Sequence, residues 1–142
     1  EPIDALCRPE VLAAQHKLVS VTQAFAIDLT GQVCADRLDG SWYGGLAAQA
    51  EFMRAAAASP GGKAIVCLAS TQDDGRTSAI RVALADGEGA TIARSDVHFV
   101  ITEYGIAYLF GRSLRDRADR DRAPGPPRGA VRAGPGRRPD PG

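Results

Sequence analysis

Short strand-like runs of apolar residues alternate along this chain with one clear helix-like run. Residues 64–69 (A-I-V-C-L-A) are continuously apolar, which is typical of a central parallel strand. Residues 98–102 (H-F-V-I-T) are rich in β-branched and aromatic side chains and end at a polar turn, 103–105, so we expect a second interior strand there. A short apolar segment, 106–110, and a helix that begins at Ser113 are expected next.

Residues 46–58 predict the clearest helix, because they are alanine-rich and are followed by the stop signal S-P-G-G. Residues 18–29 alternate as a strand or a hairpin arm would, with a turn at Thr30 and Gly31 and a returning strand at 32–35. The glycine-rich stretch 36–45 predicts a loop, whose Trp42 and Tyr43 we expect to pack onto the sheet. We expect a short helix at 9–17 and short strands at 78–84 and 90–93, which together give an α/β fold with a strand-rich layer.

Length and composition narrow the class of protein. The chain of 142 residues suits one domain with a modest core, and 44% of its residues are hydrophobic. No apolar run approaches the roughly 18 residues of a membrane span, and the first residues do not form a signal peptide, so we expect a cytoplasmic protein that does not enter membranes. Three widely spaced cysteines indicate neither a disulfide framework nor a metal site, and we expect Cys67 to be a buried core thiol.

The last residues, 119–142, differ in character from the rest. They hold six of the nine prolines, five glycines and no aliphatic residue larger than one valine. Nine arginines against four aspartates give residues 112–142 a net charge of +5, while the chain as a whole is neutral. Because such a segment cannot bury enough apolar surface to offset chain entropy, we predict a disordered tail after a folded part at 1–118.

Four sequence blocks, in order, resemble one family. They are D-L-T-G-Q-V at 28–33, Q-A-E-F-M-R-A-A at 49–56, G-G-K-A-I-V-C-L-A-S-T at 61–71, and V-H-F-V-I-T-E-Y-G-I-A at 97–107, which runs on into G-R-S-L-R-D-R-A. These blocks resemble the C-terminal domain of the acetyl-CoA hydrolase/transferase family, the class I CoA-transferases that include 4-hydroxybutyrate and succinyl-CoA:acetate CoA-transferases. The resemblance implies a partial CoA-transferase-like fold.

The resemblance also implies a reaction and site residues. In such enzymes a glutamate attacks the acyl-CoA thioester and becomes a glutamyl-CoA thioester, which a second acid or water then resolves. That nucleophile would lie upstream of Glu1, so we expect this chain to lack it. Glu103 matches the family's second active-site glutamate, which would orient the nucleophile or the substrate carboxylate; alternatively, Glu103 only caps a turn. Phe25 and Ala48 match backbone positions that contact coenzyme A.

The same resemblance implies the ligands and the assembly. Acyl-CoA and a small carboxylate would be substrates, with no permanently bound cofactor and no metal, and the full-length protein is a possible homo-oligomer. Ala48 lies in G-L-A-A-Q at 45–49, where the family has G-x-G-G-Q. An alanine therefore replaces a family glycine at this position, and alanine adopts a positive φ much less readily than glycine does. From the residues alone, we expect Asp28 and Gln32 to fix loop geometry and His98 to be a packed core histidine.

The tail also departs from the family, which has a helix with an I-A-H-P-D-like motif at this point. One set of synonymous codons for residues 119–130, read one base later, encodes I-A-I-A-H-P-D-H-R-E-A-L. We therefore hypothesise a frameshift near Ala118. The alternative is a functional arginine-rich tail that contacts nucleic acid or another acidic surface. In that case the chain would be a non-catalytic module for binding coenzyme A or a protein partner, although we expect no nucleic-acid partner.

Overall fold

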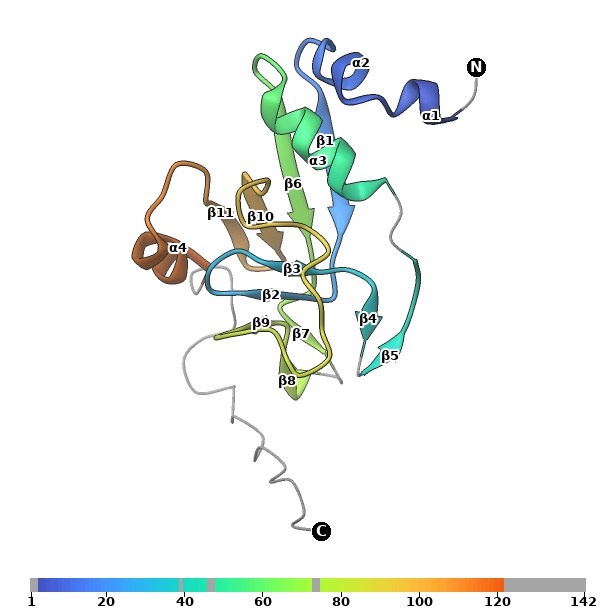
Figure 1. Ribbon diagram of the computed structural model, residues 1–142. Helices are drawn as coiled ribbons and strands as arrows, with labels where there is room; N and C mark the ends of the chain where they lie inside the picture. Colours follow the sequence, from blue (N-terminus) through green and yellow to red (C-terminus); the bar gives the residue numbers. More distant parts are fainter. Residues whose placement is uncertain (1–2, 39, 46–47, 73–74, 122–142) are drawn as a thin grey trace.

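A computed structural model describes residues 3–38, 40–45, 48–72 and 75–121 of the chain (Figure 1). The prediction for the tail falls mostly at 122–142, outside these residues. The helices are α1 (Ile3–Leu6), α2 (Pro9–Ala13), α3 (Gln49–Ala58) and α4 (Leu114–Asp121). The strands are β1 (Val19–Gln23), β2 (Ala26–Asp28), β3 (Val33–Cys34), β4 (Arg37–Leu38), β5 (Ser41–Trp42), β6 (Lys63–Cys67), β7 (Thr71–Gln72), β8 (Thr77–Ser78), β9 (Ile80–Arg81), β10 (Phe99–Thr102) and β11 (Gly105–Tyr108).

A four-stranded sheet in the order β1-β6-β10-β11 forms the centre of the molecule. Strands β1, β6 and β10 run parallel, and β11 returns antiparallel to β10. The predictions of a central strand in 64–69, of an interior strand in 98–102 and of a helix after Ser113 are confirmed. The helix α4 extends through Asp121, so it includes the first residues that we assign to the tail.

One face of the central sheet packs against α3, which crosses in front of β1 and β6 in Figure 1. Met53 and Ala56 of α3 are completely buried, as are Ala64 and Val66 of β6 and Val100 of β10. Alternate residues of a strand share a face, so this pattern places the core on the α3 side of the sheet. Burial of each large apolar side chain stabilises the fold by roughly 1.5–3 kcal/mol.

A small sheet, β3-β2-β9, lies across the carboxyl ends of β1 and β6 (Figure 1). Its residues Ile27 and Val33, together with Ile92, are completely buried in the same core as α3. Residues 90–93, expected to be a strand, contribute only an isolated bridge between Ile92 and Val33. The strand-rich layer of the prediction is therefore this second sheet.

The stretch 18–29 is two strands in different sheets, and the second of them, β2, forms the predicted hairpin with β3. The Ala24 N–H donates to the Cys67 carbonyl, which continues the ladder between β1 and β6. The next N–H, of Phe25, donates to the Cys34 carbonyl in the second sheet. The chain thus changes sheets between two consecutive residues, a corner that an alternating pattern alone does not mark.

Trp42 and Tyr43 do not pack onto the sheet as predicted, since they are 68% and 72% exposed. Each instead has one partner at the surface. The Arg37 guanidinium lies 3.9 Å from the centre of the Trp42 ring, and the Tyr43 ring meets Phe25 edge-on at 4.8 Å. These contacts hold the β4-β5 hairpin together without covering its aromatic side chains.

The other face of the central sheet carries apolar side chains that the described elements cover only in part. The register pairs Val21 with Ile65, Ile65 with Phe99, and Ile101 with Ile106, so these side chains form adjacent rows on one face. Val21 is 62% exposed and Ile106 is 67% exposed. The described elements therefore leave a row of apolar side chains on this face partly open.

Candidate functional site

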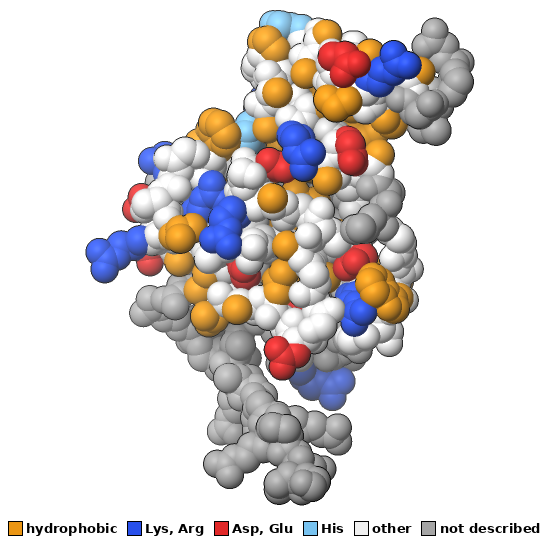
Figure 2. Space-filling model, viewed as in Figure 1, with side chains coloured by type: hydrophobic (Ala, Val, Ile, Leu, Met, Phe, Trp, Pro, Cys, Tyr) orange, Lys and Arg blue, Asp and Glu red, His pale blue; other side chains and the backbone are white. Residues whose placement is uncertain are grey.

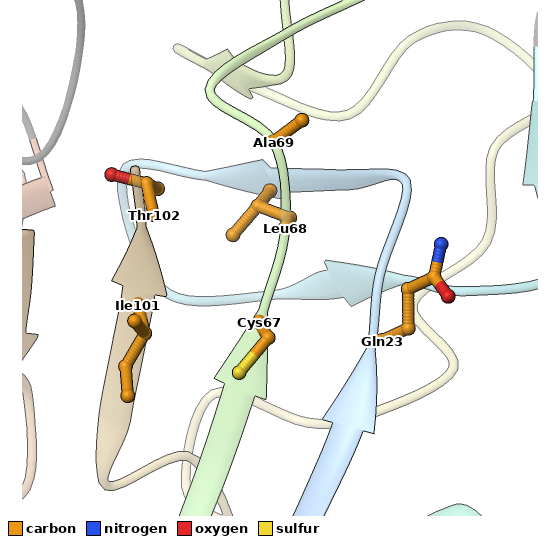
Figure 3. A pocket seen from close by; sticks show the side chains of 6 residues that line it. All are labelled: Gln23, Cys67, Leu68, Ala69, Ile101 and Thr102. Carbon is orange, nitrogen blue, oxygen red and sulfur yellow. The ribbon is translucent and has the colours of Figure 1, made fainter. Parts of the chain in front are cut away.

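The carboxyl ends of the three parallel strands border an open, shallow hollow of about 400 Å³ (Figure 3). The register aligns Cys67 at the end of β6 with Gln23 of β1 and Ile101 of β10, which brings the three strand ends to one level. In open sheets with parallel strands, ligands bind outside these ends. The hollow is lined by Gln23, Cys67, Leu68, Ala69, Ile101 and Thr102.

Glu103 follows β10 directly and belongs to this edge of the sheet. Its carboxylate accepts two hydrogen bonds from one residue, with the Ser70 N–H 2.9 Å from Oε2 and the Ser70 Oγ 2.5 Å from Oε1. The hydrogen bond from the Ser70 hydroxyl lowers the pKa of the Glu103 carboxyl, with a further contribution from the Ser70 N–H. Glu103 is otherwise exposed, so its carboxylate is ionised and open to a ligand.

Ser70 is the site residue that sequence reasoning missed. It lies in a connection, after the apolar run of β6, and it is completely buried. A small hydroxyl residue that follows an interior strand is a weak signal, because Ser and Thr are common in such connections. Its partner lies 33 residues further along the chain, so only the fold brings the two together.

Phe25 lies at the corner between the two sheets, near the hollow. Its N–H donates to the Cys34 carbonyl at 3.0 Å, and its own carbonyl accepts from the Gln72 side chain at 2.6 Å. Gln72 in turn accepts from Arg81, which forms an ion pair with Glu88 at 2.7 Å. Both backbone polar groups of Phe25 therefore have protein partners, and its contact with coenzyme A remains a prediction.

Ala48 lies at the N-terminus of α3, in a second hollow of about 450 Å³. Its φ of −67° is ordinary for alanine, so the replacement of a family glycine here causes no backbone strain. The structure does not bring Ala48 into the hollow beside Glu103, although both hollows border β1. This second hollow is lined by Val19, Ser20, Val21, Thr22, Ala48, Gln49 and Phe52.

Asp28 and Gln32 fix a turn, as the sequence predicts. Burial disfavours the charge of Asp28, but hydrogen bonds from Thr30 and Gln32 outweigh it, so the pKa of the Asp28 carboxyl is lowered. The Asp28 Oδ1 accepts from the Thr30 hydroxyl at 2.6 Å, and Oδ2 accepts from the Gln32 side chain at 2.7 Å. All the acceptor contacts of Asp28 are thus internal to the turn.

The prediction that Cys67 is a buried core thiol is wrong. Cys67 is only partly buried and lines the hollow, while Cys34 is the buried thiol, and burial raises its pKa. The side chain of Cys67 lies on the incompletely covered face of β6, since its neighbour Val66 occupies the core face. Among the described residues no group of His, Cys, Asp and Glu side chains could hold a metal ion.

His98 is a packed histidine, as expected. It is buried, and its ring lies 4.2 Å from that of Phe110, while its Nε2 has no hydrogen-bond partner among the described residues. Burial disfavours the imidazolium form and lowers the pKa of His98 from the usual 6.5. His98 is therefore neutral at physiological pH, and it lies outside the two hollows.

The neutrality of His98 predicts a loss of stability in weak acid. Below pH 6.5 the unfolded chain binds a proton at this position that the folded chain resists, so the free energy of unfolding falls as the pH drops. Urea unfolding at pH 7.5 and 5.5 measures this change. His98→Gln removes it, while His16→Gln, at an exposed histidine, retains it. An unchanged pH dependence in His98→Gln would contradict this explanation.

The charged side chains of the described residues are mixed in sign on the face seen in Figure 2. Figure 2 shows acidic and basic side chains interspersed on one face, with no large cluster of basic side chains there among the residues it colours. No helix within the described part of the chain is long and apolar enough to span a membrane.

Comparison with known proteins identifies the family. The C-terminal domain of the acetyl-CoA hydrolase/transferase family matches residues 1–120. The chain belongs to this family. It is 38% identical over 116 residues to 4-hydroxybutyrate coenzyme A transferase of Clostridium kluyveri, covering 82% of this chain and 27% of that protein. It is 41% identical over 112 residues to succinyl-CoA:acetate/propanoyl-CoA:succinate CoA transferase of Fasciola hepatica, covering 78% of this chain and 23% of that protein.

Solved structures of relatives share the fold of this CoA-transferase domain. RipA from Yersinia pestis aligns with a TM-score of 0.80 and 34% identity, over 89% of this chain and 28% of that one. The 4-hydroxybutyrate CoA-transferase from Porphyromonas gingivalis aligns with a TM-score of 0.72 and 31% identity, with the same coverage. The predicted α/β CoA-transferase-like fold is confirmed. The chain spans about a quarter of the length of these relatives.

Proposed function

We propose that this chain forms the C-terminal part of an acyl-CoA:carboxylate CoA-transferase or of an acetyl-CoA hydrolase. Its curated relatives carry the names of CoA-transferases that act on 4-hydroxybutyryl, succinyl and butyryl groups. We further propose that acyl-CoA and a small carboxylate bind as substrates, and that coenzyme A is not a permanently held cofactor.

The observation that supports this proposal is the position of Glu103. It lies at the carboxyl edge of the parallel strands, beside a hollow, and is held ionised by a buried serine. A carboxylate that merely caps a turn would bond only to its own turn, whereas the Glu103 carboxylate accepts two bonds from Ser70 in another strand connection. This geometry favours the active-site interpretation of Glu103 over the capping one.

The proposed reaction proceeds through a glutamyl-CoA thioester whose nucleophilic glutamate is not in this chain. Attack of that carboxylate on the acyl-CoA thioester releases the thiolate, which then forms the enzyme thioester and frees the acyl group as a carboxylate. Glu103, fixed and ionised, supplies an oriented hydrogen-bond acceptor beside this chemistry. Without the nucleophile, the isolated chain is expected to be inactive.

A chimera tests the proposed function. Residues 1–121 of this chain replace the matched segment of the Clostridium kluyveri transferase, and transfer of CoA from acetyl-CoA to 4-hydroxybutyrate is measured. The chimera is expected to transfer CoA, and the isolated chain is not, because only the chimera has a nucleophile. The unmodified transferase is the positive control. Turnover by the isolated chain, or a folded chimera without activity, would count against the proposal.

We retain the frameshift as a proposal for the tail. The family match ends at residue 120, close to the point where the arginine-rich and proline-rich composition begins. The nucleotide sequence of the locus decides the matter. A frameshift predicts codons that encode I-A-H-P-D when read one base later, whereas codons that exclude this reading leave the basic tail as the genuine continuation.

A further inference from the structure

The connection after β6 reaches two of the residues that the sequence assigns to the site. Ser70 donates both its N–H and its hydroxyl to Glu103, and Gln72 donates its side-chain amide to the Phe25 carbonyl at 2.6 Å. Glu103 follows β10 and Phe25 follows β1, so the connection links the ends of the strands on either side of β6. These contacts identify the connection as a brace across the carboxyl edge of the sheet.

Ser70 itself is held rigidly. It is completely buried, and its carbonyl accepts from the Ala79 N–H at 2.9 Å. Two residues earlier, the Leu68 N–H donates to the Ile101 carbonyl at 3.1 Å, which ties the same connection to β10. The backbone of Ser70 is therefore fixed, and with it the positions of its two donors. The Glu103 carboxylate forms both hydrogen bonds only when it lies opposite these donors.

We propose that Ser70 is the positioning residue of this site, and that it holds Glu103 as an ionised hydrogen-bond acceptor for N–H or O–H groups of the bound substrate. This inference deepens the proposed function and rests on it for the identity of the substrate. Each Glu103 oxygen receives one bond from Ser70, and a carboxylate offers about four acceptor positions in all. Further acceptor positions therefore remain on an exposed group.

Ionisation of Glu103 restricts what it can bind. Two carboxylates form a hydrogen bond only when one of them carries a proton, and the two hydrogen bonds from Ser70 favour the ionised form of Glu103. Direct pairing of Glu103 with an anionic carboxylate is therefore disfavoured, which departs from the role in orienting the nucleophile or the substrate carboxylate that the family resemblance implies. Glu103 suits instead the amide and hydroxyl groups of an acyl-CoA, or a carboxylic acid in its protonated form.

The pKa of Glu103, followed by NMR of its side-chain carboxyl carbon in the full chain, tests the role of Ser70. Ser70→Ala removes the hydroxyl donor, so the pKa is expected to rise toward the ordinary carboxyl value, while Ser70→Thr keeps the donor and the low pKa. The Asp28 carboxyl serves as an internal control, since its bonds come from Thr30 and Gln32. A substitution that acted only by disturbing the fold would change the pKa of Asp28 as well.

A second measurement needs no variant at Ser70. In the unaltered chain, the amide proton shift of Ser70 is expected to change with the same pH midpoint as the Glu103 carboxyl, and Glu103→Gln is expected to abolish this change. For the first measurement, Ser78→Ala is the matched control for Ser70→Ala, since the Ser78 hydroxyl bonds to the Ile80 carbonyl and not to Glu103. The proposal would be overturned if the Glu103 pKa were identical in the unaltered chain and in Ser70→Ala. It would also be overturned if the Ser70 amide proton shift did not change as Glu103 titrates.

These outcomes separate the positioning role from the proposed function. The titrations are made without coenzyme A, so they succeed or fail irrespective of whether the chimera transfers CoA. A Ser70-dependent titration beside an inactive chimera supports the positioning role and rejects the transferase function. A titration that is independent of Ser70 rejects the positioning role even if the chimera is active.

Discussion

Gly62→Ala is expected to destabilise the fold by about 3 kcal/mol or more, a large share of the 5–15 kcal/mol that is typical of domains. A Cβ atom at this position would clash with the Ala56 carbonyl oxygen and lie 2.8 Å from that of Leu18. Both atoms belong to backbone that the fold fixes, since the Lys63 N–H donates to the Leu18 carbonyl at 2.9 Å. Relief of the clash therefore requires α3 to move away from β1 and β6.

Urea unfolding followed by circular dichroism measures this effect. Gly89→Ala is the matched control, because a Cβ atom there meets nothing within 4 Å. We expect the control to lie within about 0.5 kcal/mol of the unaltered chain, as surface substitutions usually do. Equal stability of the two variants would show that α3 does not approach β6 as closely as described.

Arg117→Met is expected to cost about 2–4 kcal/mol, because it leaves partly buried carbonyl oxygens without donors. Arg117 is 8% exposed, and its guanidinium donates to the carbonyls of Arg94 at 2.5 Å and Thr30 at 3.3 Å. These bonds attach α4 to the turn of the second sheet and to the segment before β10. Arg117, the last arginine of the R-S-L-R-D-R segment, therefore has a structural role in this domain.

Thermal unfolding of Arg117→Met beside Arg115→Met checks this interpretation. Arg115 lies on the same helix and is exposed, so its replacement changes helix propensity and charge without loss of a buried bond. A large loss of stability in Arg117→Met alone is the expected result. Similar losses in both variants would assign the effect to the charge of the helix.

Sequence patterns predict the central sheet well because its signals are local. The run 64–69 is apolar on every residue, which is typical of an interior strand, and β6 has a neighbouring strand on each side in the sheet. The helix at 49–58 combines high propensity with a proline-glycine stop, and α4 begins after Ser113, whose hydroxyl accepts from the Asp116 N–H at 3.2 Å. In each case the deciding residues lie within a few positions of one another.

The sequence fails where a distant partner decides the outcome. The corner at Ala24 and Phe25 depends on which sheet offers the next carbonyl, and Trp42 and Tyr43 remain exposed because no described element covers them. Cys67 lies in an apolar run, yet the alternation of the strand turns it toward the incompletely covered face. An apolar run shows that a strand is interior but not that both its faces are covered.

The same limit applies to the candidate site. Glu103 can be found from its family motif, whereas Ser70 is recognisable only when the fold brings the ends of β6 and β10 together. Phe25 and Ala48 are assigned by resemblance alone, and the structure places them in different surroundings, with the Phe25 backbone already bonded and Ala48 beside another hollow. A motif therefore predicts which residues belong to a site more readily than it predicts how they are held.

Substitution of Glu103 in the active chimera tests the central claim most directly. Glu103→Gln keeps the size of the side chain and one acceptor oxygen, but it removes the ionised carboxylate that Ser70 holds. Glu10→Gln is the control, since Glu10 is exposed on α2 and does not line the hollow. We predict that kcat/KM for CoA transfer falls by at least about tenfold, a loss of about 1.4 kcal/mol in transition-state stabilisation, only in Glu103→Gln. A Glu103→Gln chimera as active as its parent would contradict the assignment of Glu103 to the active site.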